Sequence, residues 1–388
     1  MRWITRPLLP LIVCSAVVLA VRHSSRSDSH LAPEADDASQ FQGMGGLFDH
    51  TDAGTREGVG LWGASSLWQI FHLADGNSSS SNGTAPVDTA ANATRKEAER
   101  PPSEYEMENI LVIAKKAAIL GGNTLTKAQR DHANVEYHQK TNPQDLVSEV
   151  DRLVQRKIRG LIKRNFPKHA FLGEEEDFSA AEGSRGALDR RLHERLLWVV
   201  DPVDGTVNFL HGFPYSVVSI AVIHKEEPIV GVIYDPSRME LFWAVKGKGT
   251  YINNRKQLTV SAKSNFTESL LACGLGTTPH QREPTLRAMI GVAGEAQSVR
   301  CMGSASLSLA WVAAGRLDGY WELDMDVWDS AAGSLMVTEA QGTVTDTKGK
   351  PYALRSRNVA ATTGGVIHDR LLHLLQETVA TEPAFDVT

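Results

Sequence analysis

The chain has 388 residues, of which 42% are hydrophobic and 22% are charged. This composition is that of a folded protein with one large domain or two smaller ones. The formal net charge of -6 argues against a broad basic surface, so we expect no nucleic-acid partner. Three cysteines give no disulfide framework, and Cys273 and Cys301 are expected as buried free thiols, although they could pair.

The first residues have the pattern of a targeting segment. Two arginines precede an uninterrupted apolar run over residues 7–21, which Arg22 closes. A run of this length suits the core of a signal peptide and falls short of the roughly 20 residues that cross a bilayer. We predict a signal peptide or signal anchor over residues 1–23, and a secretory protein that is lumenal or attached to the membrane through this segment only. A transit peptide to a plastid or another organelle is the alternative, because no acidic residue precedes Asp28.

A low-complexity stretch follows the leader. Residues 24–102 are rich in Ser, Gly, Ala, Asp and Asn without sustained periodicity, which predicts a disordered stalk. The folded catalytic part is then expected over residues 103–388. Glycosylation sequons, which agree with a secreted glycoprotein, occur at Asn77, Asn82, Asn92 and Asn265.

The folded part is predicted to open with two helices. Apolar residues recur at helical spacing over residues 104–120, and Gly121-Gly122 is expected to end that helix. A second helical pattern starts at Asp151 and reaches Phe166. Asp151 at its start is compatible with a simple helix cap as well as with a functional acid.

A short strand and an acidic run come next. Residues 170–172 form an apolar run that leads through Gly173 to Glu174, an arrangement that would aim this glutamate at a ligand. Acidic runs are more often solvated surfaces, and that alternative stays open here. Residues 177–195 are predicted to be a polar connection.

The central stretch follows this connection. Residues 196–200 predict a buried strand that stops at Asp201, where a proline and a glycine force a turn. The turn would bring together Asp201, Asp204 and the Thr206 hydroxyl. Two carboxylates a few ångström apart repel each other unless a cation lies between them, and oxygen ligands without Cys or His favour Mg²⁺ or Mn²⁺. An ordinary Asp/Pro/Gly turn is the alternative.

The rest of the chain predicts a layered mixture of strands and helices. β-branched and aromatic runs over residues 217–223, 229–234 and 241–245 predict antiparallel hairpins. The second half alternates between the two element types, and the whole order favours an α/β (α+β) fold. Its strands are expected at residues 270–272, 299–302, 319–323, 342–344 and 359–361, and its helices near residues 284–294, 304–314, 328–340 and 366–379.

Three strings of residues carry a family resemblance. They are G-E-E at residues 173–175, W-V-V-D-P-V-D-G-T-V-N-F at residues 198–209 and W-D-S-A-A-G at residues 328–333. In content and order they resemble the inositol monophosphatase family of Mg²⁺-dependent, lithium-sensitive phosphatases. The likeness extends from about residue 104 to residue 378, and it implies the αβαβα sandwich of sugar phosphatases and a phosphoric monoester hydrolase.

The resemblance also implies a set of metal ligands. The family binds two or three Mg²⁺ ions, and the first would be held by Glu174, Asp201 and the Val203 carbonyl. Asp201, Asp204 and Asp329 would hold a second ion, with Asp201 as the bridge.

Catalytic roles are implied in the same way. Thr206, hydrogen-bonded to Asp151, would orient and deprotonate the attacking water, and Glu174 would be a further catalytic residue. The backbone amides of Gly205 and Thr206 would cradle the phosphate. Paired cations suit this reaction because they neutralise a doubly negative phosphate and stabilise the leaving alkoxide.

For the substrate, the resemblance implies contacts at one acid and one loop. Glu322 would accept ring hydroxyl groups, and Thr277 would contribute. The expected loop is Gly303-Ser304-Ala305, and supporting positions are expected at Lys140 and Asp145.

The predicted reaction is hydrolysis of inositol monophosphate, or a similar small polyol phosphate, to the free polyol and phosphate in a homodimer. Two alternatives stay open: a lumenal 3'-phosphoadenosine 5'-phosphate phosphatase, and a non-catalytic scaffold with the same fold. Val207 stands where many relatives have a second threonine, and the segment between Glu174 and Asp201 is longer than is usual in the family.

Overall fold

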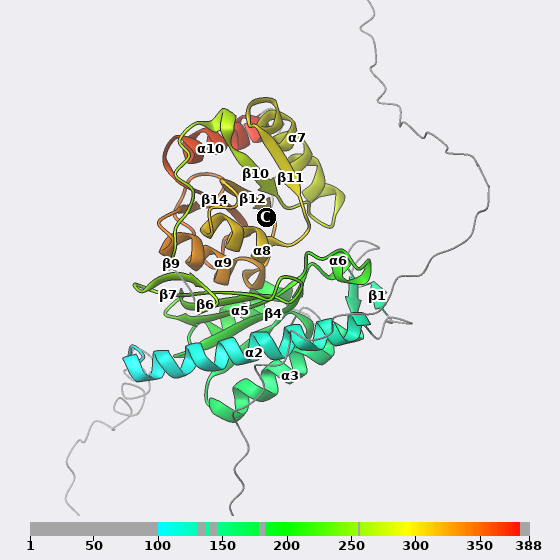
Figure 1. The fold of residues 1–388 in the computed structure, drawn as a ribbon, viewed down its shortest axis with the longest axis vertical. Coiled ribbons are helices and arrows are strands. Elements are labelled where there is room, and N and C mark those ends of the chain that lie inside the picture. Colours follow the sequence, from blue (N-terminus) through cyan, green and yellow to red (C-terminus); the bar gives the residue numbers. More distant parts are fainter. Residues whose placement is uncertain (1–99, 131–136, 140–145, 178–182, 255–256, 381–388) are drawn as a thin grey trace, which may run out of the picture. The chain divides into compact units, whose positions relative to one another are not determined.

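The computed structural model describes residues 100–130, 137–139, 146–177, 183–254 and 257–380 (Figure 1). The predicted leader and stalk lie outside these ranges apart from residues 100–102, and so do Lys140 and Asp145. Within these ranges, none of the helices combines the length and the apolar content that crossing a bilayer requires.

Two helices cover the outer face of the first sheet (Figure 1). They are α2 (Glu104–Arg130) and α3 (Glu149–Asn165). The prediction that Gly121-Gly122 ends the first helix is wrong, since α2 continues past them. A Cβ on Gly122 would lie only 2.3 Å from Cδ1 of Tyr234 in the sheet. The glycine pair therefore permits close packing of the helix on the sheet.

The first sheet has the strand order β3-β4-β5-β6-β7-β8-β9. β3 and β4 are parallel and the other neighbours are antiparallel, as predicted for the hairpins after the central stretch. All residues of β4 and β5 are buried, because helices cover both faces of the sheet. The strands are Ala170–Gly173, Leu197–Asp204, Val217–His224, Glu227–Asp235, Glu240–Val245, Gly249–Ile252 and Gln257–Leu258.

Short elements lie around this sheet. The predicted polar connection contains a helix, α5 (Gly183–Arg191), whose Ala187 and Leu188 are buried in the core between the sheets. Its low amphipathic periodicity explains why the sequence did not reveal it. The remaining short elements are β1 (Tyr137–Gln139), β2 (Leu146–Ser148), α4 (Glu174–Asp177) and α6 (Thr206–Leu210).

The second sheet has the order β11-β10-β12-β14-β13. The strand β10 lies parallel to both of its neighbours, and β14 is antiparallel to both of its own. Both predicted thiols are free; Cys273 is buried, but Cys301 is exposed because β11 is an edge strand. In chain order the strands are Leu270–Cys273, Ser298–Cys301, Gly319–Leu323, Thr343–Thr345 and Asn358–Thr362, and a short 3-10 turn, Phe266–Glu268, precedes them.

Four helices complete the layers. The pair α8 (Ala305–Ala313) and α9 (Val327–Glu339) packs between the two sheets, and α7 (Pro279–Glu295) and α10 (Gly365–Ala380) cover the outer face of the second sheet. Each interface between layers has its own apolar core. The order helices, sheet, helices, sheet, helices confirms the predicted αβαβα sandwich (Figure 1).

Candidate functional site

The end of β4 carries the central carboxylates. The strand does not stop at Asp201, as the sequence suggested, but continues through the proline to Asp204, with a shift of register against β5 between the two acids. The Val203 amide donates to Asp201 Oδ1 at 2.9 Å. Such an irregularity at a strand end re-aims side chains, and here it directs both buried acids into one pocket.

The turn after β4 places Thr206. Gly205 has φ of +92°, and a Cβ there would lie 2.8 Å from the Tyr215 carbonyl oxygen, so only glycine fits without strain. Thr206 Oγ1 lies 3.0 Å from Asp151 Oδ1 and 3.0 Å from the Val203 carbonyl oxygen. Asp151 is buried in the first turn of α3. The predicted Thr206–Asp151 pair is therefore formed.

Asp204 links the end of β4 to the start of α8. Its Oδ2 accepts from Ser304 Oγ at 2.7 Å and from the Ser306 amide at 2.6 Å, and its Oδ1 accepts from the Ala305 amide at 3.3 Å. These donors lie where α8 begins. Burial raises the pKa of Asp204 to about 6, although the three donors act in the opposite direction.

The other carboxylates of the site repel one another. Burial, followed by the charges of Glu174, Asp204 and Asp329, raises the pKa of Asp201 well above its ordinary value. Burial raises the pKa of Asp329 as well, with Asp326 as the strongest neighbouring charge. As long as no cation is present, this cluster holds protons at pH values where isolated carboxyl groups are ionised.

The carboxylates of the pocket can be compared with the requirements of a metal site in two respects, their geometry and their donor chemistry. Among the described residues, no group of three or more His, Cys, Asp or Glu side chains stands in a geometry that could hold a metal ion. The donor chemistry nevertheless fits a hard divalent cation, since the donors are carboxylate oxygens that repel one another in one buried place. A cation would replace this repulsion with attraction, so small side-chain movements toward it are favourable.

One pocket of about 460 Å³ contains nearly the whole predicted site. This volume is in the range of small-molecule sites. Asp151 lies behind Thr206 and is not part of the lining. The predicted residues that line the pocket are Glu174, Asp201, Val203, Asp204, Gly205, Thr206, Thr277, Gly303, Ser304, Ala305, Glu322 and Asp329.

Glu322 lies on β12, in the sheet opposite the β4 acids. The Tyr320 hydroxyl donates to Glu322 Oε2, and a Cβ on Gly274 would lie 2.0 Å from the Glu322 carboxyl carbon. Burial raises the pKa of Glu322 to about 7, against the opposing effect of the tyrosine. Besides the acids of α4, β4 and α9, the pocket thus contains an acid of the second sheet whose pKa is about 7.

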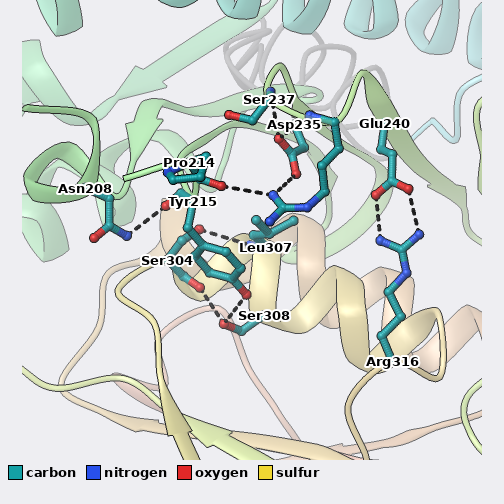
Figure 2. Close-up of polar contacts among 11 residues, drawn as sticks. Asn208, Pro214, Tyr215, Asp235, Ser237, Glu240, Ser304, Leu307, Ser308 and Arg316 are labelled. Atoms are coloured by element: carbon teal, nitrogen blue, oxygen red, sulfur yellow. Dashed lines mark hydrogen bonds and ion pairs between the residues drawn. The ribbon is translucent and has the colours of Figure 1, made fainter. Parts of the chain in front are cut away.

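Asn208 holds the loop between β11 and α8, a role that was not predicted from the sequence. Its Nδ2 donates to the carbonyl oxygens of Tyr215 at 2.8 Å and Met302 at 2.7 Å. Figure 2 shows this amide beside Tyr215, whose hydroxyl lies 3.2 Å from Ser308 Oγ, which in turn donates to the Ser304 carbonyl. Asn208 belongs to the string at residues 198–209 that carries the family resemblance, and this position was the sequence signal from which a role in the site could have been inferred.

Arg282 is a second residue of the pocket that was not predicted from the sequence. It lines the pocket from α7, and its Nε donates to the Gly276 carbonyl oxygen at 2.8 Å. Its place depends on how α7 packs on the second sheet, so nothing in the local sequence pointed to it. His211 and Leu275 line the pocket as well.

Comparisons with known proteins agree on one family. Residues 106–380 match the sequence profile of the Inositol monophosphatase family. Inositol monophosphatase 1 of Solanum lycopersicum is 39% identical over 259 residues, which cover 66% of this chain and 91% of that protein.

Two solved structures have the same fold. The crystal structure of the extragenic suppressor protein suhB from Bartonella henselae is similar with a TM-score of 0.62 and 34% identity, and the match covers 69% of this chain and 99% of that one. The inositol monophosphatase from Anabaena (Nostoc) sp. PCC 7120 gives a TM-score of 0.57 and 32% identity, with 70% and 96% covered. The order of layers, the pocket between the sheets and the match over residues 106–380 thus agree: this chain belongs to the inositol monophosphatase family, and it is an enzyme of the phosphoric monoester hydrolase class.

Proposed function

We propose that this enzyme hydrolyses inositol monophosphate, or a closely similar polyol phosphate, in a reaction that depends on Mg²⁺. The observation that carries the proposal is the cluster of buried, mutually repelling carboxylates beside the Thr206–Asp151 pair. Bound Mg²⁺ would neutralise the phosphate oxygens, lower the pKa of water and stabilise the leaving alkoxide. Its proposed ligands are Glu174, Asp201, the Val203 carbonyl, Asp204 and Asp329, for two or three ions.

The chain's own groups would prepare the attack. Thr206 Oγ1 is within hydrogen-bond reach of an ionisable partner, Asp151, so it can accept a proton from water while its own proton is held by the aspartate. Glu174 stands at the start of α4, and the Glu175 amide next to it is fixed by Gln155 Oε1 at 3.0 Å. The Gly205 and Thr206 amides are proposed to receive the phosphate.

The polyol is proposed to lie toward β12. Glu322, when ionised, accepts hydrogen bonds from hydroxyl groups, and the 303–305 loop and Thr277 line the same pocket. A carboxylate at this position can recognise hydroxyl groups, which suits a polyol.

The test is phosphate release from inositol 1-phosphate by the purified chain and by Asp201→Asn. We expect activity that requires Mg²⁺ in the parent and a loss of at least about 100-fold in the variant, because the variant loses a bridging charge. Asp369→Asn, at an exposed acid of α10, is the matched control and should keep full activity. Substantial Mg²⁺-dependent activity in Asp201→Asn would refute the ligand assignment.

A second substrate class is favoured by one observation. Arg282 lines the pocket, and a guanidinium there can pair with a second phosphate, as in 3'-phosphoadenosine 5'-phosphate. Comparing kcat/KM for this nucleotide and for inositol 1-phosphate decides between the two. A clear preference for the nucleotide that Arg282→Gln removes would overturn the polyol proposal and keep the metal site.

We also propose a secretory location and a homodimeric state. The support for the location is the arginine-flanked apolar run over residues 7–21 and the four sequons. Asn265, the only sequon asparagine in the described residues, is exposed, as a glycosylation acceptor has to be. A glycosidase-sensitive shift in gel mobility after expression in eukaryotic cells tests the location, and light scattering tests the dimer.

A further inference from the structure

Cys273 and Cys301 lie directly opposite each other in the second sheet. They end the adjacent parallel strands β10 and β11 and are paired in the strand register. Neighbouring strands are about 4.8 Å apart, which falls within the Cα separation that a disulfide spans. Because the two residues are register partners on adjacent strands, their side chains lie on the same face of the sheet, side by side.

The two thiols differ in the way that an attacking and a resolving cysteine differ. Cys301 is exposed on the edge strand, whereas Cys273 is buried under α7 and α10. The hydrogen bond from Cys273 lowers the pKa of Cys301 to about 7, so a large fraction of it is thiolate at neutral pH. Accessibility and thiolate content together make Cys301 the nucleophile of the pair.

Both cysteines precede loops that shape the pocket. Cys273 is followed by Gly274, against which the Glu322 carboxyl group packs. Cys301 is followed by Met302 and Gly303, whose carbonyl oxygens accept from Asn208. A covalent bond between the strand ends would therefore act on the substrate end of the pocket from both sides.

We propose that Cys273 and Cys301 form a reversible disulfide that changes how the pocket binds its substrate. The oxidant is a small-molecule disulfide of the glutathione type. The Cys301 thiolate attacks one of its sulfur atoms and releases one glutathione thiolate. Cys273 then loses its proton and attacks the Cys301 sulfur, which releases the second, so two thiols and one glutathione disulfide give one protein disulfide and two glutathione molecules.

The bond fixes the two side chains against each other at the strand ends. The sulfur atoms approach to about 2.0 Å when the disulfide forms. The side chain of Cys301 therefore reorients, and the change reaches the loop that Asn208 holds, because that loop begins directly after Cys301. Small displacements of positioning groups reduce turnover markedly, so the oxidised enzyme has a lower kcat/KM, by about tenfold, mainly through KM.

The first test is chemical and does not depend on the proposed function. The reduced full chain with Cys14→Ser is incubated with glutathione disulfide, alkylated, digested with trypsin and analysed by mass spectrometry without reduction. We expect a peptide pair linked through Cys273 and Cys301 that dithiothreitol separates, and no such pair in Cys301→Ser or Cys273→Ser. Stable mixed glutathione adducts on Cys301, or two unmodified thiols, would overturn the proposal.

The second test measures the effect on the pocket and rests on the proposed function. KM for inositol 1-phosphate should rise on oxidation and return after reduction, and it should not respond in Cys301→Ser. A linked pair without any change in KM would remove the coupling to the pocket while the disulfide itself stands. If the reduced enzyme is inactive, the displacement is followed instead by protection of the 302–305 amides from hydrogen exchange, and unchanged protection contradicts the coupling.

Discussion

The carboxyl group of Glu322 changes its charge close to neutral pH, because its burial in β12 raises its pKa to about 7. An ionised carboxylate accepts hydrogen bonds from polyol hydroxyl groups at both oxygens, whereas a protonated one accepts fewer. We expect KM for inositol 1-phosphate to fall as the pH rises from about 6 to 8. Glu322→Gln should flatten this part of the profile; an unchanged profile in the variant would assign the titration to another group.

Asn208 is predicted to position the loop of Ser304 rather than to touch the substrate. Asn208→Ala removes the bonds to the Tyr215 and Met302 carbonyl oxygens, so the Ser304 hydroxyl loses its fixed place beside Asp204. We expect kcat/KM to fall by about 10- to 100-fold. Asn208→Asp also lacks the Nδ2 donor and serves as the comparison. If the role of Asn208 were purely structural, its loss would lower the melting temperature and leave the kinetics of the folded fraction intact.

At the residue scale, the sequence was informative wherever a side chain is fixed by its own neighbours. Asp201, Asp204 and Thr206 share one strand end and one turn, so their convergence was predictable from the chain itself. The bond from Ser304 to Asp204 joins residues 100 positions apart, and only the resemblance pointed to that loop. Arg282 had no signal, because its place depends on how a distant helix packs.

Among the elements, α2 shows why a glycine pair was misread as a helix end. Gly122 faces the ring of Tyr234, whereas Gly160 of α3 has as its nearest neighbour the end of the flexible Arg164 side chain, at 3.6 Å. Helix-ending and close-packing glycines look alike in a sequence, and the sheet that distinguishes them lies far along the chain. The strands of the second half were predictable because their apolar runs are short and separated by clear turns.

This difference gives a paired prediction for stability. Gly160→Ala should raise the free energy of unfolding by about 0.5–1 kcal/mol, since alanine costs less backbone entropy in a helix. Gly122→Ala should lower it by about 1–3 kcal/mol, since the added methyl group forces helix and sheet apart. Urea unfolding of both variants measures the two values, and stabilisation by Gly122→Ala would show that the sheet yields easily.

For the whole molecule, the carboxylate cluster makes stability depend on pH and on the cation. Asp204 has a pKa of about 6 in the folded protein and an ordinary value of 3.8, so its proton is held more tightly in the folded state. Without a cation, stability is lost as the pH rises through this interval, because folding then has to bury a charge. We expect the melting temperature to fall between about pH 4 and pH 6.5 in EDTA.

Magnesium should reverse that loss. At about pH 7.5 we expect Mg²⁺ to bind the folded state alone and to raise the melting temperature, whereas at about pH 4.5 protons compete for the same oxygens and the effect should be small. Scanning calorimetry with and without Mg²⁺ at the two pH values measures this. An equal effect of Mg²⁺ in Asp201→Asn would place the ion elsewhere.

The hydrogen bonds of Asp204 to the start of α8 also bear on how the enzyme is made. The proposed ligands come from three segments, α4, β4 and α9, and Asp151 and Thr206 belong to two different elements of the first half. When only the first sheet has been synthesised, Asp204 is present, but the hydrogen-bond donors at residues 304–306 are not. The nascent chain therefore cannot complete the pocket until α9 has emerged.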